Sequence, residues 1–257
     1  MIRIKSEEEI EILRENAILV SKTLAEVGKH VAPGVTTMQL DKIAETFIRD
    51  NGAEPGFLGY GGFPYTLCLS VNDVVVHGFP SDYKLREGDI VSVDCGTIYK
   101  GYYGDSAYTF PVGEVDEETA KLLRVTKESL YRGIEKAVAG NRIGDIGHAI
   151  QSYTEGFGFS VVREMVGHGI GKDMHEHPEV PNYGKAGTGK KLVKGMTICI
   201  GPMINAGGKA IYLHENGWAV STCDKKKSAH FELTVAVGDE KADILSTFDF
   251  IEGKRQY

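Results

Sequence analysis

The sequence predicts an α+β fold of two pseudo-symmetric halves, in which helices cover a curved antiparallel sheet. The first observation is an order of helix, helix and strands that occurs twice along the chain. The second is a nearly constant offset, 106 residues from Gly52 to Gly158 and 107 residues from Gly88 to Gly195. Such self-similarity is typical of a duplicated unit, although amphipathic helices also resemble one another by chance. We expect one domain over 1–257, with repeats of roughly 1–112 and 113–257.

Four helices are expected, two in each half. Ser6 and Thr36 are each followed three residues later by Glu or Gln, which is the capping-box pattern of a helix start. Apolar residues at helical spacing follow both caps, and glycine ends each stretch. The same spacing predicts helices over 116–139 and around 146–153, ended by Gly140 and Gly156.

Short apolar runs between glycines and polar turns predict the strands. The expected strands are 65–71, 74–76, 89–94, 104–110, 159–166, 196–200, 217–222 and 229–237.

Composition favours a soluble cytoplasmic protein. The net charge of -7 disfavours DNA as a partner, and no apolar run is long enough to span a bilayer. The four cysteines are widely spaced, which indicates buried reduced thiols rather than a zinc knuckle or a disulfide framework. We expect a monomer that does not bind membranes.

Four residues have the chemistry of ligands for a divalent metal: Asp94, Asp105, His168 and Glu232. Asp94 and Asp105 flank a glycine-bearing turn, so a hairpin would bring both carboxylates to neighbouring strands. Taken singly, solvated edge aspartates and a histidine in a hydrogen-bonded glycine turn are the plainer interpretations. Glu232 interrupts an apolar strand, where a charge needs a partner or a cation. Together the four favour a metal centre.

The two halves differ at one position of this set. Residues 85–94 read LREGDIVSVD and residues 192–201 read LVKGMTICIG. Each is a turn with glycine followed by an apolar strand, but the first ends on the carboxylate Asp94 and the second on Gly201. The repeat therefore indicates a vacated ligand position at Gly201.

Such a centre would suit hydrolysis. Two divalent metals that share bridging carboxylates activate water for attack on a carbonyl group. His77 and His175 are not needed as ligands, so they are free to hydrogen-bond a substrate amide and to stabilise an oxyanion. His177 is expected at the surface. The sequence points to a dinuclear hydrolase whose rate the missing carboxylate would lower.

Six stretches resemble, in residues and order, the type I methionine aminopeptidases, which have the pita-bread fold. They are 70–78 (SVNDVVVHG), 88–94 (GDIVSVD), 104–106 (GDS), 167–171 (GHGIG), 202–206 (PMINA) and 229–232 (AHFE). The resemblance covers nearly the whole chain. It implies a single catalytic domain that removes the initiator methionine from nascent proteins when the next residue is small.

The resemblance also implies a role for each site residue. Asp94 would chelate one metal and His168 the other, with Asp105 and Glu232 bridging two ions of cobalt, manganese, iron or zinc. His77 would contact the scissile amide and His175 the carbonyl oxygen. The methionine pocket would be lined by Tyr60, Phe63, Cys68, Met174 and Trp218. For these five side chains, ordinary core packing is the alternative.

Gly201 departs from the family, which carries a glutamate there that ligates the histidine-bound metal and moves a proton. The activity would therefore be impaired, and a catalytically weak or inactive pita-bread binding protein is the alternative. The basic segments 185–194 and 225–227 are expected to be solvated loops. A further hypothesis is that they make a transient contact with the ribosome, where the N-terminal methionine of nascent polypeptides emerges.

Overall fold

The first half of the chain begins with two helices that pack on a four-stranded sheet. In the computed structural model, which describes residues 2–253, α1 (Glu7–Gly28) and α2 (Thr37–Asp50) both start with the predicted capping boxes. The sheet has the order β1-β4-β2, with β5 paired to β4. Its strands are β1 (Glu54–Pro55), β2 (Leu67–Val71), β4 (Ile90–Tyr99) and β5 (Tyr102–Pro111).

The second half follows the same order of elements. It opens with α3 (Glu117–Ile134) and α4 (Ile143–Gly156), and α4 matches α2 in length at the predicted offset. Its five-stranded sheet has the order β15-β14-β9-β7-β8. The strands are β7 (Gly167–Gly169), β8 (Glu176–Val180), β9 (Thr197–Ile200), β14 (Leu233–Ala236) and β15 (Asp243–Ile244). Superposition of the two halves stays a prediction.

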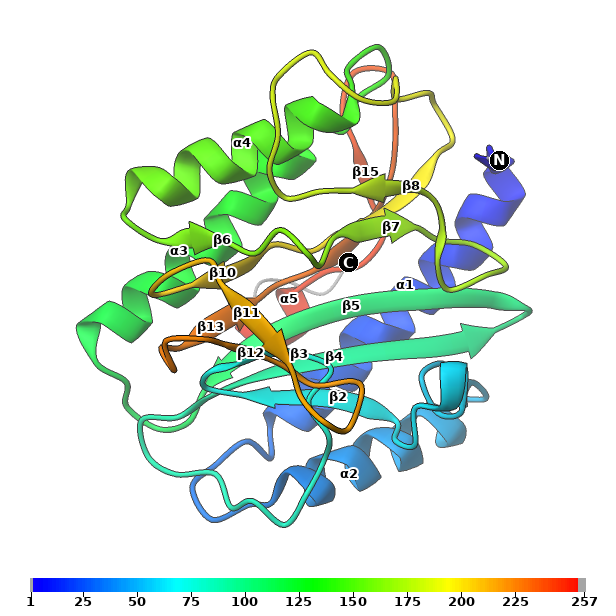
Figure 1. The fold of residues 1–257 in the computed structure, drawn as a ribbon. Coiled ribbons are helices and arrows are strands. Elements are labelled where there is room, and N and C mark those ends of the chain that lie inside the picture. The colour runs from blue at the N-terminus through cyan, green and yellow to red at the C-terminus, as the bar shows by residue number, and fades with distance from the viewer. Residues whose placement is uncertain (1, 254–257) are drawn as a thin grey trace.

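There are also two smaller sheets, of which one lies within the second half and the other joins one strand of the first half to two strands of the second. One sheet contains β6 (Ser160–Val161), β10 (Met203–Asn205) and β13 (Ser228–His230), and the other contains β3 (Val74–Val76), β11 (Ile211–Leu213) and β12 (Val220–Thr222). Ala107 on β5 and Glu232 exchange two backbone hydrogen bonds, of 3.2 and 2.9 Å. This bridge joins the two large sheets at the centre of the molecule (Figure 1).

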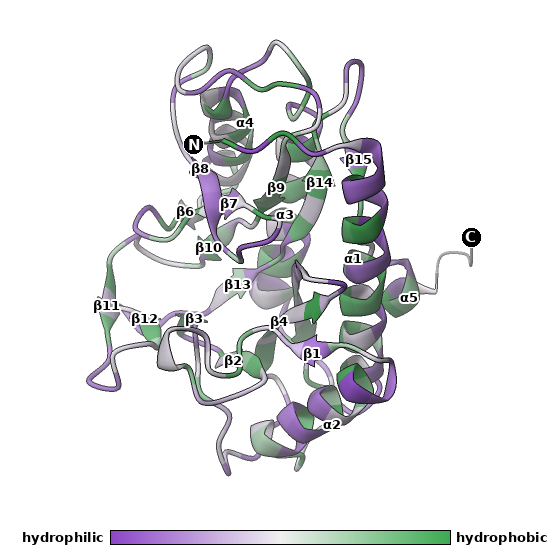
Figure 2. Ribbon diagram, turned by 90° about the vertical axis from the view of Figure 1, so that its right-hand side faces the viewer, coloured by the Kyte–Doolittle hydropathy of each residue, from purple (hydrophilic) through white to green (hydrophobic). Residues whose placement is uncertain are grey.

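α1 lies on one side of the strands, and the β11–β12 hairpin lies on the other (Figure 2). α1 packs on β4 and β5, while α3 packs on β13 and β10. Two large apolar cores fill the space beneath the helices, one around Leu24 and one around Leu130. The predicted layout of antiparallel strands under four main helices is confirmed, with a short α5 (Asp249–Glu252) added near the end. Between residues 2 and 253, no helix has both the length and the apolar character needed to cross a bilayer.

Some predicted boundaries are wrong, for reasons of tertiary structure. The helix expected over 116–139 ends at Ile134, because the backbone of Val138 and Ala139 pairs with Gly238 instead of extending the helix. The strand expected over 229–237 is broken at Glu232, where the chain pairs with β5. The strand expected over 159–166 contributes only β6.

Candidate metal centre

Two of the predicted ligands lie on the β4–β5 hairpin, as their spacing predicts. The hairpin turns at Lys100 and Gly101, whose φ angles of 50° and 77° suit a two-residue turn. Asp94 pairs with Ala107, two residues from Asp105, so both aspartates face the same side of the sheet. Asp94 lies in the middle of β4 rather than at its end, because β4 continues to Tyr99.

His168 lies on the short strand β7 rather than in a loop. A Cβ on Gly167 would lie 2.2 Å from a carbonyl oxygen of β9, and one on Gly169 would lie 2.4 Å from that of His177. These glycines therefore permit the close strand packing that places the histidine. Its Nδ1 lies 2.9 Å from the carbonyl of Gly169, and its Nε2 lies 3.4 Å from Oδ2 of Asp105. With Nδ1 donating to the carbonyl, Nε2 is the atom available to a metal.

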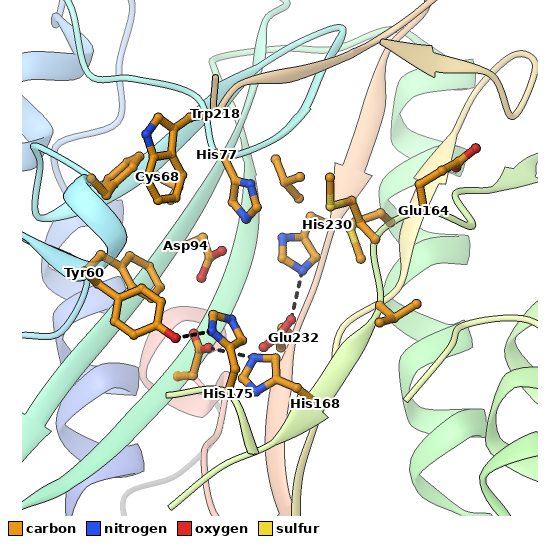
Figure 3. A pocket seen from close by; sticks show the side chains of 17 residues that line it. Tyr60, Cys68, His77, Asp94, Glu164, His168, His175, Trp218, His230 and Glu232 are labelled. Carbon is orange, nitrogen blue, oxygen red and sulfur yellow. Dashed lines mark hydrogen bonds and ion pairs between the residues drawn. The ribbon is translucent and has the colours of Figure 1, made fainter. Parts of the chain in front are cut away.

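Glu232 enters the site at the break between β13 and β14. Besides the bridge to Ala107, its carbonyl accepts a hydrogen bond from Oγ of Ser106 at 2.6 Å. These backbone bonds hold the side chain in the cleft, where Oε2 lies 3.1 Å from Nε2 of His230 (Figure 3). All four predicted ligands line the same cavity.

Gly201 follows β9 directly, and its neighbour fills the space beside it. A Cβ at this position would lie 1.8 Å from Oε2 of Glu232 and 2.7 Å from its Cδ. The Glu232 carboxylate thus occupies the volume of a side chain at 201. The backbone is held in place by Asn182, whose Nδ2 donates to the Gly201 carbonyl at 2.9 Å.

The carboxylates of the site need a cation. Burial, then Asp105 and Glu232, raises the pKa of Asp94 well above its usual range, and burial with Glu232 raises that of Asp105 to about 6. Burial opposes the ionisation of Glu232 as well, but the hydrogen bond with His230 keeps its pKa below the usual value. Oδ1 of both aspartates is buried without a hydrogen-bond partner. Unpaired carboxylate oxygens facing an imidazole are the donor set that a divalent metal fits.

The imidazole of His168 carries a positive charge, opposite to that of the carboxylates. Burial lowers the pKa of His168, but the hydrogen bond and charge of Asp105 outweigh it and raise the pKa to about 9. The ring of His175 lies 4.4 Å from that of His168. Partial burial of its ring, then this charge, lowers the pKa of His175 to about 4. Burial followed by His230 also lowers the pKa of His77. His77 and His175 are therefore neutral near pH 7.

The cavity has a volume of about 280 Å³ and is lined by apolar side chains on one part of its wall and by the acidic cluster on another. His77 lies at its wall, 6.2 Å ring to ring from Trp218, which in turn packs 5.1 Å from Phe63. Tyr60 lies at the exposed rim, with its hydroxyl 2.7 Å from Nδ1 of His175 (Figure 3). The predicted pocket residues among the lining side chains are Tyr60, Phe63, Cys68 and Trp218.

Met174 does not line this cavity. It is fully buried, and its Cε lies 2.8 Å from where a Cβ on Gly96 would stand. Its predicted contact with substrate stays a prediction. His177 is exposed, as expected.

Besides Glu164, which lines the cavity, two polar side chains near the metal centre were not predicted. His230 is 3% exposed and faces Glu232, and Cys199 is fully buried beside Asp105, His168 and Glu232. Burial, then Asp105 and Glu232, raises the pKa of the Cys199 thiol well above its usual value. Strand alternation was the available signal, since each lies two residues before a site position, Gly201 or Glu232.

The basic segments behave differently from one another. Residues 185–191 are exposed, as expected of a solvated loop. Lys227 is instead anchored, because its Nζ donates to the carbonyl of Gly88 at 2.8 Å and to Oγ1 of Thr119 at 3.0 Å. Lys225 is exposed and pairs with Asp73.

Comparison with known proteins gives one consistent result. Residues 11–239 match metallopeptidase family M24. A methionine aminopeptidase of Clostridium acetobutylicum is 53% identical over 247 residues, which cover 96% of this chain and 99% of that protein. Methionine aminopeptidase 1 of Bacillus subtilis is 48% identical over 246 residues, covering 96% and 99%. The crystal structure of methionine aminopeptidase from Rickettsia prowazekii superposes with a TM-score of 0.95 at 42% identity, covering 96% and 100%.

Proposed function

Since the chain belongs to metallopeptidase family M24 and shares the pita-bread fold of the methionine aminopeptidases, we propose that it removes the initiator methionine from nascent proteins when the next residue is small. It does so as a monomer in the cytoplasm. The observation that carries this proposal is the convergence of Asp94, Asp105, His168 and Glu232 beside an apolar cavity.

Two divalent metals are held by these residues in the proposal. Asp94 serves one metal and His168 the other, while Asp105 and Glu232 reach both; cobalt, manganese, iron and zinc all suit such ligands. When bound, the metals polarise the scissile carbonyl and make water nucleophilic near neutral pH. The unpaired Oδ1 atoms of Asp94 and Asp105 support this assignment.

The neutral histidines position the peptide. With the Tyr60 hydroxyl donating to Nδ1 of His175, the ring proton is on Nε2, which donates to the carbonyl oxygen of the substrate. His77 lies between the cavity and the acidic cluster, where it contacts the scissile amide. Donors aimed at the developing oxyanion lower the barrier to attack.

The cavity sets the side-chain preference. Phe63 and Trp218 both line it, and their rings pack edge to face, 5.1 Å apart. An unbranched thioether fills irregular aromatic pockets well, because sulfur makes favourable contacts with rings. Methionine is the residue that combines this shape with these contacts.

Gly201 impairs the proposed activity. Glycine supplies neither the carboxylate that would bind the histidine-side metal nor a group that moves a proton. Without a further donor on the histidine side, the metal beside Asp94 should be held more tightly than the metal beside His168. The relatives do not favour the alternative of a non-enzymatic binding protein, since they are named as methionine aminopeptidases.

A methionyl-peptide assay tests the function. The purified chain is given Met-Ala and Met-Trp peptides with cobalt, manganese, iron or zinc, and release of methionine is measured beside a Gly201→Glu variant. We expect release from Met-Ala in preference to Met-Trp, and loss of release with a chelator. If neither protein releases methionine with any metal while both are folded, the proposal fails.

The ribosome contact is a separate proposal that concerns the exposed lysines of segment 185–194. Substitution of Lys185, Lys190 and Lys191 by Gln should reduce co-sedimentation with ribosomes. Unchanged sedimentation would remove this proposal without affecting the peptidase.

A further inference from the structure

Cys199 holds a position in the strand framework that faces the metal centre. It lies on β9, directly opposite His168 on β7 and Thr234 on β14. Gly201 lies two residues farther along the chain, so an extended backbone directs both positions to the same side. The thiol therefore faces the side on which the sequence lacks a carboxylate.

The distances bring this thiol within the ligand cluster. One donor atom from each of Asp105, His168, Cys199 and Glu232 lies within 4.8 Å of the other three. Within the described residues 2–253, this group is the set of three or more such side chains that is close enough to hold one ion. Asp105 adds a buried Oδ1 without a hydrogen-bond partner, which is a second sign that the cluster faces a ligand.

The surroundings of the thiol leave it available. Its hydrogen-bond partner is the Thr234 hydroxyl, at an Sγ to Oγ1 distance of 3.4 Å. That hydroxyl also lies 2.8 Å from the carbonyl of Asp105, to which it donates. A sulfur atom held by one long hydrogen bond is free to turn its lone pairs toward an ion.

We propose that Sγ of Cys199 is a metal ligand that replaces the carboxylate missing at Gly201, so that Asp105, His168, Cys199 and Glu232 hold the histidine-side metal. This inference rests on the proposed metal-dependent function. One sulfur, one nitrogen and two oxygens form a four-donor set that suits tetrahedral zinc and also cobalt or iron. A thiolate disfavours manganese, which prefers oxygen ligands. The chain would thus select a softer metal than a site of carboxylates and imidazole alone.

Thiolate-to-metal charge transfer tests the ligand directly. Every protein used in this test carries a Cys223→Ser substitution, because Cys223 is an exposed free thiol that would bind metal by itself. We expect titration with cadmium or cobalt to produce an ultraviolet absorption band that saturates at the intensity of one thiolate. Metal binding by calorimetry without that band would overturn the inference.

Two alanine variants assign the band to one thiol. Cys199→Ala should lose it and bind cadmium roughly 10- to 100-fold more weakly. Cys68→Ala is the matched control, because Cys68 is buried in the same cavity and lies opposite Asp94, yet stands outside the four-ligand group. A band that persists in Cys199→Ala, or that disappears in Cys68→Ala, would contradict the inference. If Cys199→Ala fails to fold by circular dichroism, Cys199→Ser serves the same comparison.

The peptidase assay separates this inference from the proposed function. Methionine release without a thiolate band would refute the cysteine ligand alone. A thiolate band without methionine release by either the unmodified chain or Gly201→Glu would refute the function and leave the ligand assignment standing.

Discussion

Strands β4 and β9 occupy matching places in the two halves but bring different chemistry to the cleft. β4 extends for 10 residues and pairs with β5 along its length, and it supplies Asp94 from its middle. β9 has four residues, pairs with β7 and β14, and stops immediately before Gly201. Among the proposed metal ligands, the first half therefore contributes only carboxylate oxygens, from a long hairpin. The second contributes imidazole, thiol and carboxylate from short strands.

This difference teaches that two halves with the same order of elements need not supply the same kinds of ligand. The hairpin fixes two aspartates through many ladder hydrogen bonds. The second half holds its groups through individual contacts, such as the bridge from Ala107 to Glu232. Substitutions in the second half should therefore change metal preference and rate more readily than they change the fold.

A carboxylate at position 201, directly after β9, is expected to have the largest effect. Gly201→Glu should raise the rate of methionine release by about 10²- to 10⁴-fold, since a proton-transferring carboxylate contributes on that scale. The backbone accepts a side chain there once the Glu232 carboxylate moves away from His230. The turnover number at saturating metal is the measurement.

Gly201→Gln is the matched control, because it has the size of glutamate without the charge. It should not restore the rate. If the unmodified chain already equals Gly201→Glu at saturating metal, Gly201 does not limit turnover.

Removal of the proposed oxyanion donor comes next. His175→Ala, made in the Gly201→Glu background, should lower kcat about 10²- to 10³-fold, the usual loss for one such donor. His177→Ala is the control, because His177 is exposed and lies two residues away. Equal losses in both variants would indicate a structural effect of the segment rather than a role for His175.

The packing of the two halves can be compared by substitutions that create a cavity at corresponding positions of their cores. Leu24 in α1 and Leu130 in α3 are both fully buried and lie at the repeat offset. Each Leu→Ala substitution should lower the free energy of unfolding by about 2–5 kcal/mol. Urea denaturation measures the loss. A clearly smaller value in one half would show that its core adjusts more easily and that the halves are not equivalent supports.

The smallest effect concerns Asp41, whose place in the second half is taken by Gly147. Asp41 accepts hydrogen bonds from the backbone of Thr66 and Leu67, yet burial raises its pKa from the usual range of an aspartate to about 6. The native state thus binds the proton more strongly than the unfolded state, so stability falls as pH rises from about 4 to 6. Asp41→Asn keeps an acceptor and removes the charge. It should stabilise the protein by about 1 kcal/mol above pH 6, allowing for partial solvent screening, and by less at pH 4. Equal stabilisation at both pH values would contradict this account.

Much of the framework could be predicted because its determinants are local. The capping boxes at Ser6 and Thr36 and the turn before Gly104 depend on residues close together in sequence. The end of α3 and the break at Glu232 could not, because they depend on pairing with Gly238 and Ala107, which lie far away along the chain. A strand pattern in the sequence does not show which distant segment the backbone of that strand will pair with.

The residues of the site also divide into those that the sequence could predict and those that depend on long-range pairing. Four residues have types that suggest metal ligands, and the family resemblance implied which metal each would bind: Asp94, Asp105, His168 and Glu232. The sequence suggests that Cys199 is an ordinary core thiol. Its proposed role as a metal ligand depends on the register of β9 against β7, which places it opposite His168. The contact of His230 was hard to predict for a similar reason. Its partner, Glu232, is two residues away, and the extended backbone is what places the two side chains side by side.

The competition for space between Glu232 and position 201 has a consequence for evolution. A residue with a Cβ at 201 and the present rotamer of Glu232 exclude each other, so the effect of a substitution at either place depends on the other. His230 joins this group, because it stabilises the rotamer that fills the gap. The three positions are therefore epistatic, and the order in which substitutions accumulate matters. In a lineage that first optimises the Glu232–His230 pair, a glutamate at 201 becomes harder to accommodate with each step.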